Sequence, residues 1–184
     1  PHIIKMKTLL DAKKQPKSII FTINAGMIPS DHWVHDPIVG GGRIIGEVCH
    51  FIDLMCFLSG SPINEWSVQS MDDGTLKDKV TINLIFKDGS LGSIHYLANG
   101  SKRFPKERVE VFCGGSIIQL DNFRKMKGYG WAGFNKMNLW RQDKGHKLEI
   151  QTFLDSVRFG KQSPISINEL IEETRITLEI ANSL

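Results

Sequence analysis

The sequence predicts a single α+β domain built on an open, mostly antiparallel sheet with helices on one face. Three observations support this prediction: helical patterns stand at both ends of the chain, a run of short strand patterns fills the middle, and one apolar helical pattern follows the first strand. A chain of 184 residues is long enough for one substantial core. We therefore expect residues 1–184 to form one domain.

The composition narrows the range of partners. Hydrophobic residues make up 41% and charged residues 23%, and the net charge is only +3, as in an ordinary globular protein. No basic block suggests nucleic acid, and no apolar run is long enough to be a membrane helix. The three cysteines lack a C-x-x-C spacing, which favours free thiols in a reducing compartment. We expect a cytoplasmic protein with neither a nucleic acid nor a membrane as its partner.

The first third of the chain contains a helix, a strand, a long loop and a second helix. Residues 1–14 carry a helical apolar stripe, and the absence of an initiator Met suggests a piece of a longer protein. Residues 17–24 alternate as a strand. The loop of about fifteen residues that follows is long enough to be functional. A helix is expected from about Gly42 to Leu58.

The rest of the chain predicts sequential strands and then two helices. Asp88-Gly89 and Gly114-Gly115 mark hairpin turns. Residues 122–143 are expected to be a loop that carries positive charge. The last helix opens with a capping box formed by Ser166 and Glu169. The predicted strands are 64–71, 78–86, 91–98, 107–113 and 116–123, and the predicted helices are 146–160 and 166–184.

The helix at 42–58 carries an unusual polar stripe in an apolar setting. Glu47, His50 and Asp53 are three residues apart, behind three glycines. An imidazole exchanges its proton near neutrality, and a neighbouring carboxylate would fix its tautomer. The pattern fits a general acid/base at the mouth of a pocket. It fits equally well a histidine–carboxylate cluster that only ties the helix to the sheet.

Three segments make a family resemblance specific. "GGGRIIGEVCHFIDLMCFLSG", "FKDGSLGSIHY" and "EIQTFLDSVRFGKQSPISINELIEETRITLEIANS" resemble the C-terminal domain of the glucose–fructose oxidoreductase and inositol dehydrogenase (Gfo/Idh/MocA) family. The resemblance covers almost the whole chain. It implies an open sheet like that of the C-terminal domain of glyceraldehyde-3-phosphate dehydrogenase. It also implies a Rossmann domain elsewhere that binds NAD or NADP. Since no G-x-G-x-x-G follows a strand, we expect no Rossmann domain in this chain and no cofactor bound by it.

The resemblance also assigns roles to residues. His50 takes the position of the family's active-site histidine, which accepts or relays the proton of a substrate hydroxyl while hydride passes to nicotinamide. The family commonly carries an aspartate four residues earlier, where this chain has Gly46, so Glu47 is the candidate to replace it. Asp53 matches the acid that follows the histidine and is expected to hold the helix geometry. Gly41 and Gly42 would bring the helix start up to the ligand.

Further candidates for substrate binding lie outside this helix. Asn24 ends the first strand and could meet a polyol, or could simply form a turn. Trp33 could cover a sugar ring or pin its own loop. Lys144 and His146 precede a helix and could reach an anionic substrate group, although solvation of a helix start explains them as well.

The sequence thus favours the substrate-binding domain of an oxidoreductase that acts on a sugar, a nucleotide-sugar or a cyclic polyol. A non-catalytic assembly or sugar-sensing module is an alternative. A metal-dependent isomerase or lyase using His32, His35 and His50 is another, but no metal is expected because the spacing matches no known structural pattern. The resemblance implies a homodimer or homotetramer through the bare sheet face. Four residues are expected to line that face: Ile85, Ile94, Tyr96 and Phe112.

Overall fold

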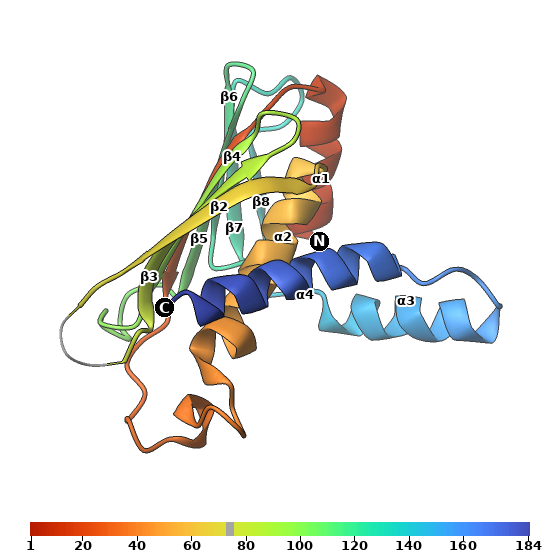
Figure 1. Ribbon diagram of the computed structural model, residues 1–184. Coiled ribbons are helices and arrows are strands. Elements are labelled where there is room, and N and C mark those ends of the chain that lie inside the picture. The colour runs from red at the N-terminus through yellow and green to blue at the C-terminus, as the bar shows by residue number, and fades with distance from the viewer. Residues whose placement is uncertain (73–75) are drawn as a thin grey trace.

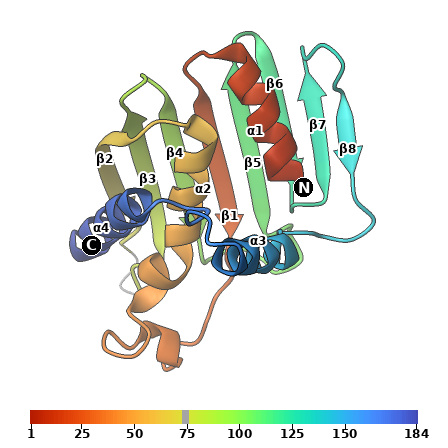
Figure 2. The same ribbon diagram turned by 90° about the vertical axis from the view of Figure 1, so that its right-hand side faces the viewer.

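The computed structural model describes residues 1–72 and 76–184, and the strands of these residues form one open sheet. The eight described strands follow the order β2-β3-β4-β1-β5-β6-β7-β8 (Figures 1 and 2). Neighbouring strands are antiparallel except β1 and β4, which are parallel. The strands are β1 (Ser18–Asn24), β2 (Ile63–Ser70), β3 (Lys79–Phe86), β4 (Leu91–Leu97), β5 (Glu107–Cys113), β6 (Ser116–Asp121), β7 (Lys125–Tyr129) and β8 (Lys136–Asn138).

The helices gather on one side of this sheet, so the predicted fold class is confirmed (Figure 2). Helix α2 packs over β1 and β4, and α4 packs in turn on α2. In contrast, α3 lies away from the sheet (Figure 1). No helix in the described part of the chain is long and apolar enough to cross a membrane. The helices are α1 (His2–Lys13), α2 (Cys49–Ser59), α3 (His146–Arg158) and α4 (Ile167–Asn182), with a short 3-10 turn at Trp33–His35 and a π-helical turn at Ile44–Val48.

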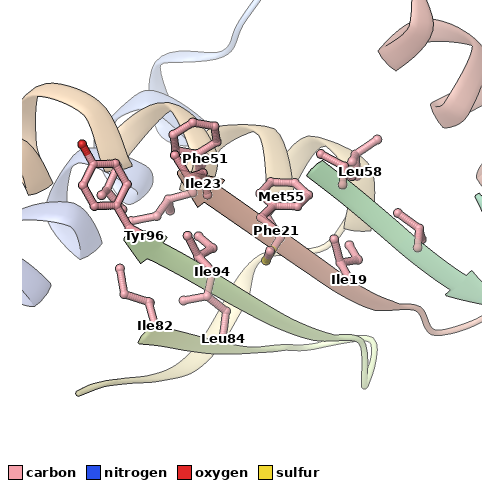
Figure 3. Close-up of a cluster of buried hydrophobic side chains, with 14 of the residues drawn as sticks. Ile19, Phe21, Ile23, Phe51, Met55, Leu58, Ile82, Leu84, Ile94 and Tyr96 are labelled. Carbon is pink, nitrogen blue, oxygen red and sulfur yellow. The ribbon is translucent and has the colours of Figure 1, made fainter. Parts of the chain in front are cut away.

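The core lies between the sheet and helices α1 and α2. Strand alternation directs one set of side chains under the helices, and the rings of Phe21 and Phe51 meet edge to face with centroids 6.4 Å apart (Figure 3). Met55 of α2 sits directly above Gly92 of β4, where a Cβ atom would collide with the Met55 sulfur. Glycine at this position therefore lets α2 approach the sheet closely.

The other face of the sheet is not covered by described residues, but its lining differs from the expectation. Ile85 and Phe112 are about 40% exposed there, as predicted. The prediction was wrong for Ile94 and Tyr96, which are fully buried under the helices. In β4 the buried positions are Gly92, Ile94 and Tyr96, so the strand turns the opposite set of residues outward.

The segment 122–143 was expected to be a loop, and that prediction was wrong. It contains β7 and β8, which extend the sheet by two strands beyond β6. Neither strand has a marked hydrophobic alternation, because Met126 is the sole buried residue of β7 and β8 has none. Lysines at 125, 127 and 136 dominate the two strands, as is usual where a sheet ends at an unpaired edge.

Candidate active site

A glycine turn leads from the long loop after β1 into the helical segment. The carbonyl of Asp36 accepts hydrogen bonds from the amides of Gly40 and Gly41, each at 2.9 Å. Gly41 and Gly42 have φ angles of +65° and +82°, which side-chain-bearing residues rarely adopt. The triplet therefore supplies backbone conformations that this turn requires.

The helix that follows is not the single α-helix predicted over 42–58. Residues Ile44–Val48 form a π-helical turn, in which the amide of Cys49 donates to the carbonyl of Ile44 five residues earlier. A π turn contains more residues than an α turn, so it changes the direction of every side chain that follows it. Glu47 lies within this turn and His50 lies after it, so the two do not share the stripe that a regular α-helix would give.

Glu47 is paired with Arg43 rather than with His50. The Nε of Arg43 donates to Oε1 of Glu47 at 2.8 Å, and the Nζ of Lys106 lies 3.9 Å from the other carboxylate oxygen. Burial by itself would raise the pKa of Glu47, but its hydrogen bond with Arg43, the nearby Tyr96 hydroxyl and the two positive charges outweigh it, so the pKa is lowered. Glu47 is therefore an anion at neutral pH.

Arg43 is the centre of a buried polar cluster. Its side chain is only 2% exposed, and it donates to the carbonyl of Gly26 at 2.8 Å and to Asp78 at 3.4 Å. The guanidinium also lies 5.2 Å from the ring centroid of Tyr96, in cation–π contact. Burial, followed by the charge of Glu47, raises the pKa of the Tyr96 hydroxyl. Arg43 thus ties the loop after β1, the π turn, β4 and the residue before β3 to one another.

His50 and Asp53 line a pocket between α2 and α4, and neither Arg43 nor Glu47 belongs to its lining. The pocket has a volume of about 310 Å³ and a mostly apolar wall. His50 is exposed to solvent there, within the part of the wall that α2 contributes. The residues lining the pocket are Ile45, Cys49, His50, Asp53, Ile165, Leu170, Glu173, Thr174, Thr177 and Leu178.

Glu173 of α4 brings a second carboxyl group to Asp53. Burial, followed by a hydrogen bond with Asp53 and the charges of Asp53, Glu169 and Glu172, raises the pKa of Glu173 to about 8. Asp53 and Glu173 also line a second hollow of about 620 Å³. Glu173 therefore carries a proton near neutrality and, through its hydrogen bond with Asp53, joins α4 to α2.

The residues expected from the loop after β1 are placed apart from this pocket's lining. The Nδ2 of Asn24 donates to the carbonyls of Ser101 and Phe104 at 2.7 and 3.2 Å, so this side chain holds a neighbouring loop. Trp33 is 62% exposed, and its ring lies 5.6 Å from that of His32. Neither residue lines the pocket of His50.

The two candidates before α3 are also separate from the pocket. Lys144 donates to the buried carboxylate of Glu107 at 2.6 Å and lies over the ring of Phe123. His146 is the exposed first residue of α3. Of the residues that the sequence singled out, the structure thus brings only His50 and Asp53 together in the pocket.

The structure offers neither a metal site nor a reactive thiol among the residues described. Within 1–72 and 76–184, no group of three or more His, Cys, Asp or Glu residues could hold a metal ion. The three cysteines are free, and burial raises the pKa of Cys49 and of Cys56, which keeps both thiols protonated.

Sequence reasoning did not single out Arg43 or Glu173, and it placed Tyr96 on the bare sheet face rather than in this cluster. The i, i+4 spacing of Arg43 and Glu47 is a recognisable helical ion pair and could have revealed the first contact. Tyr96 and Glu173 come from β4 and α4, and no local pattern links them to the helix of His50. Gly46, where the family commonly has an aspartate, is exposed, and a Cβ there would meet no described atom within 4 Å.

Solved structures of several oxidoreductases share this fold. An oxidoreductase domain protein from Kribbella flavida superposes with a TM-score of 0.80 at 17% identity, over 98% of this chain and 60% of the other. Aldose-aldose oxidoreductase from Caulobacter crescentus, in complex with glycerol, superposes with a TM-score of 0.78 at 13% identity, over 99% of this chain and 58% of the other. UDP-N-acetylglucosamine 3-dehydrogenase from Acidithiobacillus ferrooxidans superposes with a TM-score of 0.74 at 14% identity, over 97% of this chain and 58% of the other.

These identities establish the fold alone, and this chain spans about three fifths of the length of each of these proteins. No curated protein sequence matches the chain. The model of the GFO/IDH/MocA C-terminal domain matches residues 5–118, which is more than half of the chain and includes the glycine turn, Arg43, Glu47 and His50. The chain therefore belongs to the GFO/IDH/MocA oxidoreductase family, as a C-terminal domain of that family.

Proposed function

We propose that this chain is the substrate-binding domain of an NAD- or NADP-dependent oxidoreductase that acts on a sugar, a nucleotide-sugar or a cyclic polyol. The observation that carries the proposal is the exposed imidazole of His50 in the pocket between α2 and α4. A pocket of about 310 Å³ is at the lower end of the range for small-molecule sites. One structural relative is a UDP-sugar dehydrogenase and another acts on aldoses, which supports this substrate class.

In this proposal His50 accepts the proton of a substrate hydroxyl as the carbon that bears it is oxidised. Glu47 cannot be its direct partner in the present arrangement, because the carboxylate is held by Arg43. We propose that Glu47 instead keeps Arg43 in place and so fixes the π turn that presents His50. Asp53, one α-helical turn after His50, lies in the same pocket and would orient the imidazole or the substrate.

The cofactor would have to come from outside this chain. NAD(P)-binding domains place the pyrophosphate at a helix N-terminus that directly follows a parallel strand and a glycine-rich turn. In the described residues the one parallel pair is β1 and β4, and β1 leads into the long loop rather than directly into a helix. These residues therefore do not fit a dinucleotide, and hydride acceptance would be the contribution of a further domain.

The test is the His50→Ala variant of the complete oxidoreductase. Removing a general acid/base typically costs about 10²- to 10⁴-fold in rate, so we expect kcat to fall by that amount with the circular dichroism spectrum unchanged. His95→Gln is the matched control, since His95 lies on the other face of the sheet and bonds Thr81. It should leave kcat within about twofold of wild type. If His50→Ala also stays within twofold across the pH range, His50 is not the acid/base.

We further propose that the bare sheet face binds a second copy of this chain. The strand register places one residue from each of six neighbouring strands, β3, β4, β1, β5, β6 and β7, in a single row across this face. All of these residues are apolar except Ser18 of β1. An exposed row of this length favours a protein contact. Phe112→Glu should convert the dimer or tetramer to monomers in sedimentation at tens of micromolar, whereas a monomeric wild type would contradict the proposal. The apolar members of the row are Ile85, Leu91, Phe112, Ile117 and Tyr129.

A further inference from the structure

The loop between β4 and β5, residues 98–106, carries three cations and no acid, and it is referred to here as the basic loop. Lys102, Arg103 and Lys106 are all exposed. Among the described residues, the side chains of Lys102 and Arg103 form neither an ion pair nor a hydrogen bond. Like charges held close together repel one another, so this group attracts an anion from solution.

Two acidic side chains border the basic loop, but each has its closest contact with a cation from elsewhere in the fold. Glu47 lies 2.8 Å from Arg43 and only 3.9 Å from Lys106. Glu107, which directly follows the loop, is buried and lies 2.6 Å from Lys144. The positive charge of the loop is therefore largely left without compensation by these two carboxylates.

The basic loop is anchored to the end of β1, so its charges stand on a backbone that is already held. The Nδ2 of Asn24 donates to the loop carbonyls of Ser101 and Phe104. Gly100 packs against the same side chain, since a Cβ atom there would collide with Oδ1 of Asn24. Asn24 thus acts by holding the loop that carries the charges. A ligand that binds to a loop held in this way loses less conformational entropy.

The basic loop lies at the end of the sheet where the helix of His50 begins (Figure 1). Strands β1 and β4 are parallel, with Asn24 paired to Leu97, so the chain leaves both strands at the same edge. The contact of Lys106 with Glu47 places the loop against the π turn, which leads directly into α2. The loop and His50 therefore border the same turn.

The surface of the π turn is open between the loop and the pocket of His50. Ile45 of this turn lines the pocket, and Glu47 of the same turn faces the loop. Gly46 stands between them in the chain and is exposed, and a Cβ atom there would meet no described atom within 4 Å. A ligand that crosses the turn at Gly46 meets no side chain of that residue.

We propose that the basic loop binds the diphosphate of a nucleotide-sugar substrate whose sugar ring lies in the pocket of His50. This inference rests on the proposed function and narrows it, because the nucleotide-sugar is the one proposed substrate class that always carries phosphate. The guanidinium of Arg103 can form paired hydrogen bonds with phosphate oxygens, and the lysines add charge of freer orientation. In such a substrate the diphosphate is joined directly to the sugar ring, so the loop and the pocket hold adjacent parts of one molecule.

Binding of two probes, pyrophosphate and UDP, to the complete oxidoreductase tests this proposal by calorimetry. Phosphate loses charge-assisted hydrogen bonds in the double variant Lys102→Gln/Arg103→Gln, so we expect the Kd of both probes to rise by about 10- to 100-fold. The matched control is Lys14→Gln/Lys87→Gln, which removes two exposed charges near the opposite end of β1 and β4. It should change each Kd by less than about twofold.

The phosphates of the dinucleotide cofactor are the competing source of the same chemistry. If the double variant raises the KM of the cofactor and leaves the Kd of UDP unchanged, the loop binds the cofactor and the proposal is overturned. It is also overturned if the wild type binds neither probe below about 10 mM, or if the control variant loses as much affinity as the loop variant.

His50→Ala distinguishes this inference from the proposed function. This variant should lower kcat and leave the Kd of UDP unchanged, because His50 lies in the pocket and not on the basic loop. Normal turnover of His50→Ala together with loop-dependent binding of UDP would contradict the acid/base role alone. Normal affinity for UDP in the loop variant would contradict the diphosphate site alone.

Discussion

Helices α1 and α3 are nearly equal in length, yet one is part of the core and the other is not. The twelve residues of α1 direct Met6 and Leu10 onto the sheet, where both are fully buried. The thirteen residues of α3 carry an equally regular apolar stripe, and all four of its members are more than half exposed. An apolar stripe thus shows which face of a helix needs to be covered. It does not show whether the same chain supplies the cover.

The difference also concerns charge. Close to the core, Arg43 is enclosed by two acidic side chains, a carbonyl and an aromatic ring. On α3, Arg158 is exposed and lies 5.5 Å from the ring centroid of Phe159. We infer that the stability of this chain depends more on the region around α1, α2 and the π turn than on α3.

The largest expected effect comes from removing the central buried charge. Arg43→Met would remove the 2.8 Å partner of the Glu47 carboxylate and one of the two cations beside Asp78, the other being Lys79, so we expect a loss of about 3–5 kcal/mol in the free energy of unfolding. The same substitution on α3, Arg158→Met, should change that free energy by less than about 0.5 kcal/mol. Urea denaturation followed by circular dichroism measures both. Equal losses would remove the distinction between the two regions.

A leucine on each helix sharpens the comparison with identical chemistry. Leu10 of α1 is fully buried, so Leu10→Ala should cost about 2–5 kcal/mol through lost burial and the cavity left behind. Leu154 of α3 is 56% exposed, so Leu154→Ala should cost less than about 0.5 kcal/mol in the 184-residue chain. A large loss from Leu154→Ala would mean that α3 packs against this chain in solution, contrary to the structure.

A smaller effect should appear as a pH dependence at the junction of α2 and α4. Burial and Asp53 raise the pKa of Glu173 to about 8, above that of an unfolded glutamate, so the folded state binds the additional proton. This contribution is fully present below about pH 4 and is lost as the pH rises through about 8. Since Glu173 is only half-buried, we expect a loss of about 1–2 kcal/mol after solvent screening.

Thermal unfolding measured from about pH 6 to about pH 9 tests this dependence. The melting temperature of the wild type should fall across this interval by about 2–8 °C. Glu173→Gln keeps a hydrogen-bond donor facing Asp53 at every pH, so its melting temperature should fall less. A variant with the same slope as the wild type would assign the dependence to other groups.

Much of the fold could be predicted from local patterns because each pattern depends on neighbours in the chain. The alternation over residues 17–24 puts Ile19, Phe21 and Ile23 on one face of a strand, and all three are buried in β1. The capping box at Ser166 and Glu169 is present, with both of its hydrogen bonds. The lysine-rich strands β7 and β8 were missed because they have few buried residues and therefore little alternation to recognise.

The candidate site was less predictable than the fold. The glycine triplet and the spacing of His50 and Asp53 were sufficient to select a helix that borders a pocket. The pairing of Glu47 with Arg43 instead of His50 could not be predicted, because a single π turn redirects the side chains and no local pattern marks that turn. Local patterns also could not predict which face of the sheet Ile94 and Tyr96 occupy. Both lie on the face that α2 covers, where Tyr96 contacts the buried Arg43.

The sequence by itself determined the helices, most of the strands, the glycine turn and the family resemblance, because these depend on residues a few positions apart. Only the tertiary structure decided that β1 lies between β4 and β5, that Arg43 gathers Glu47, Asp78 and Tyr96, and that Glu173 faces Asp53. These contacts join residues that are distant in the chain, and their energies come from burial and charge in a shared enclosed space. No periodicity in a linear sequence records which distant residues share that space.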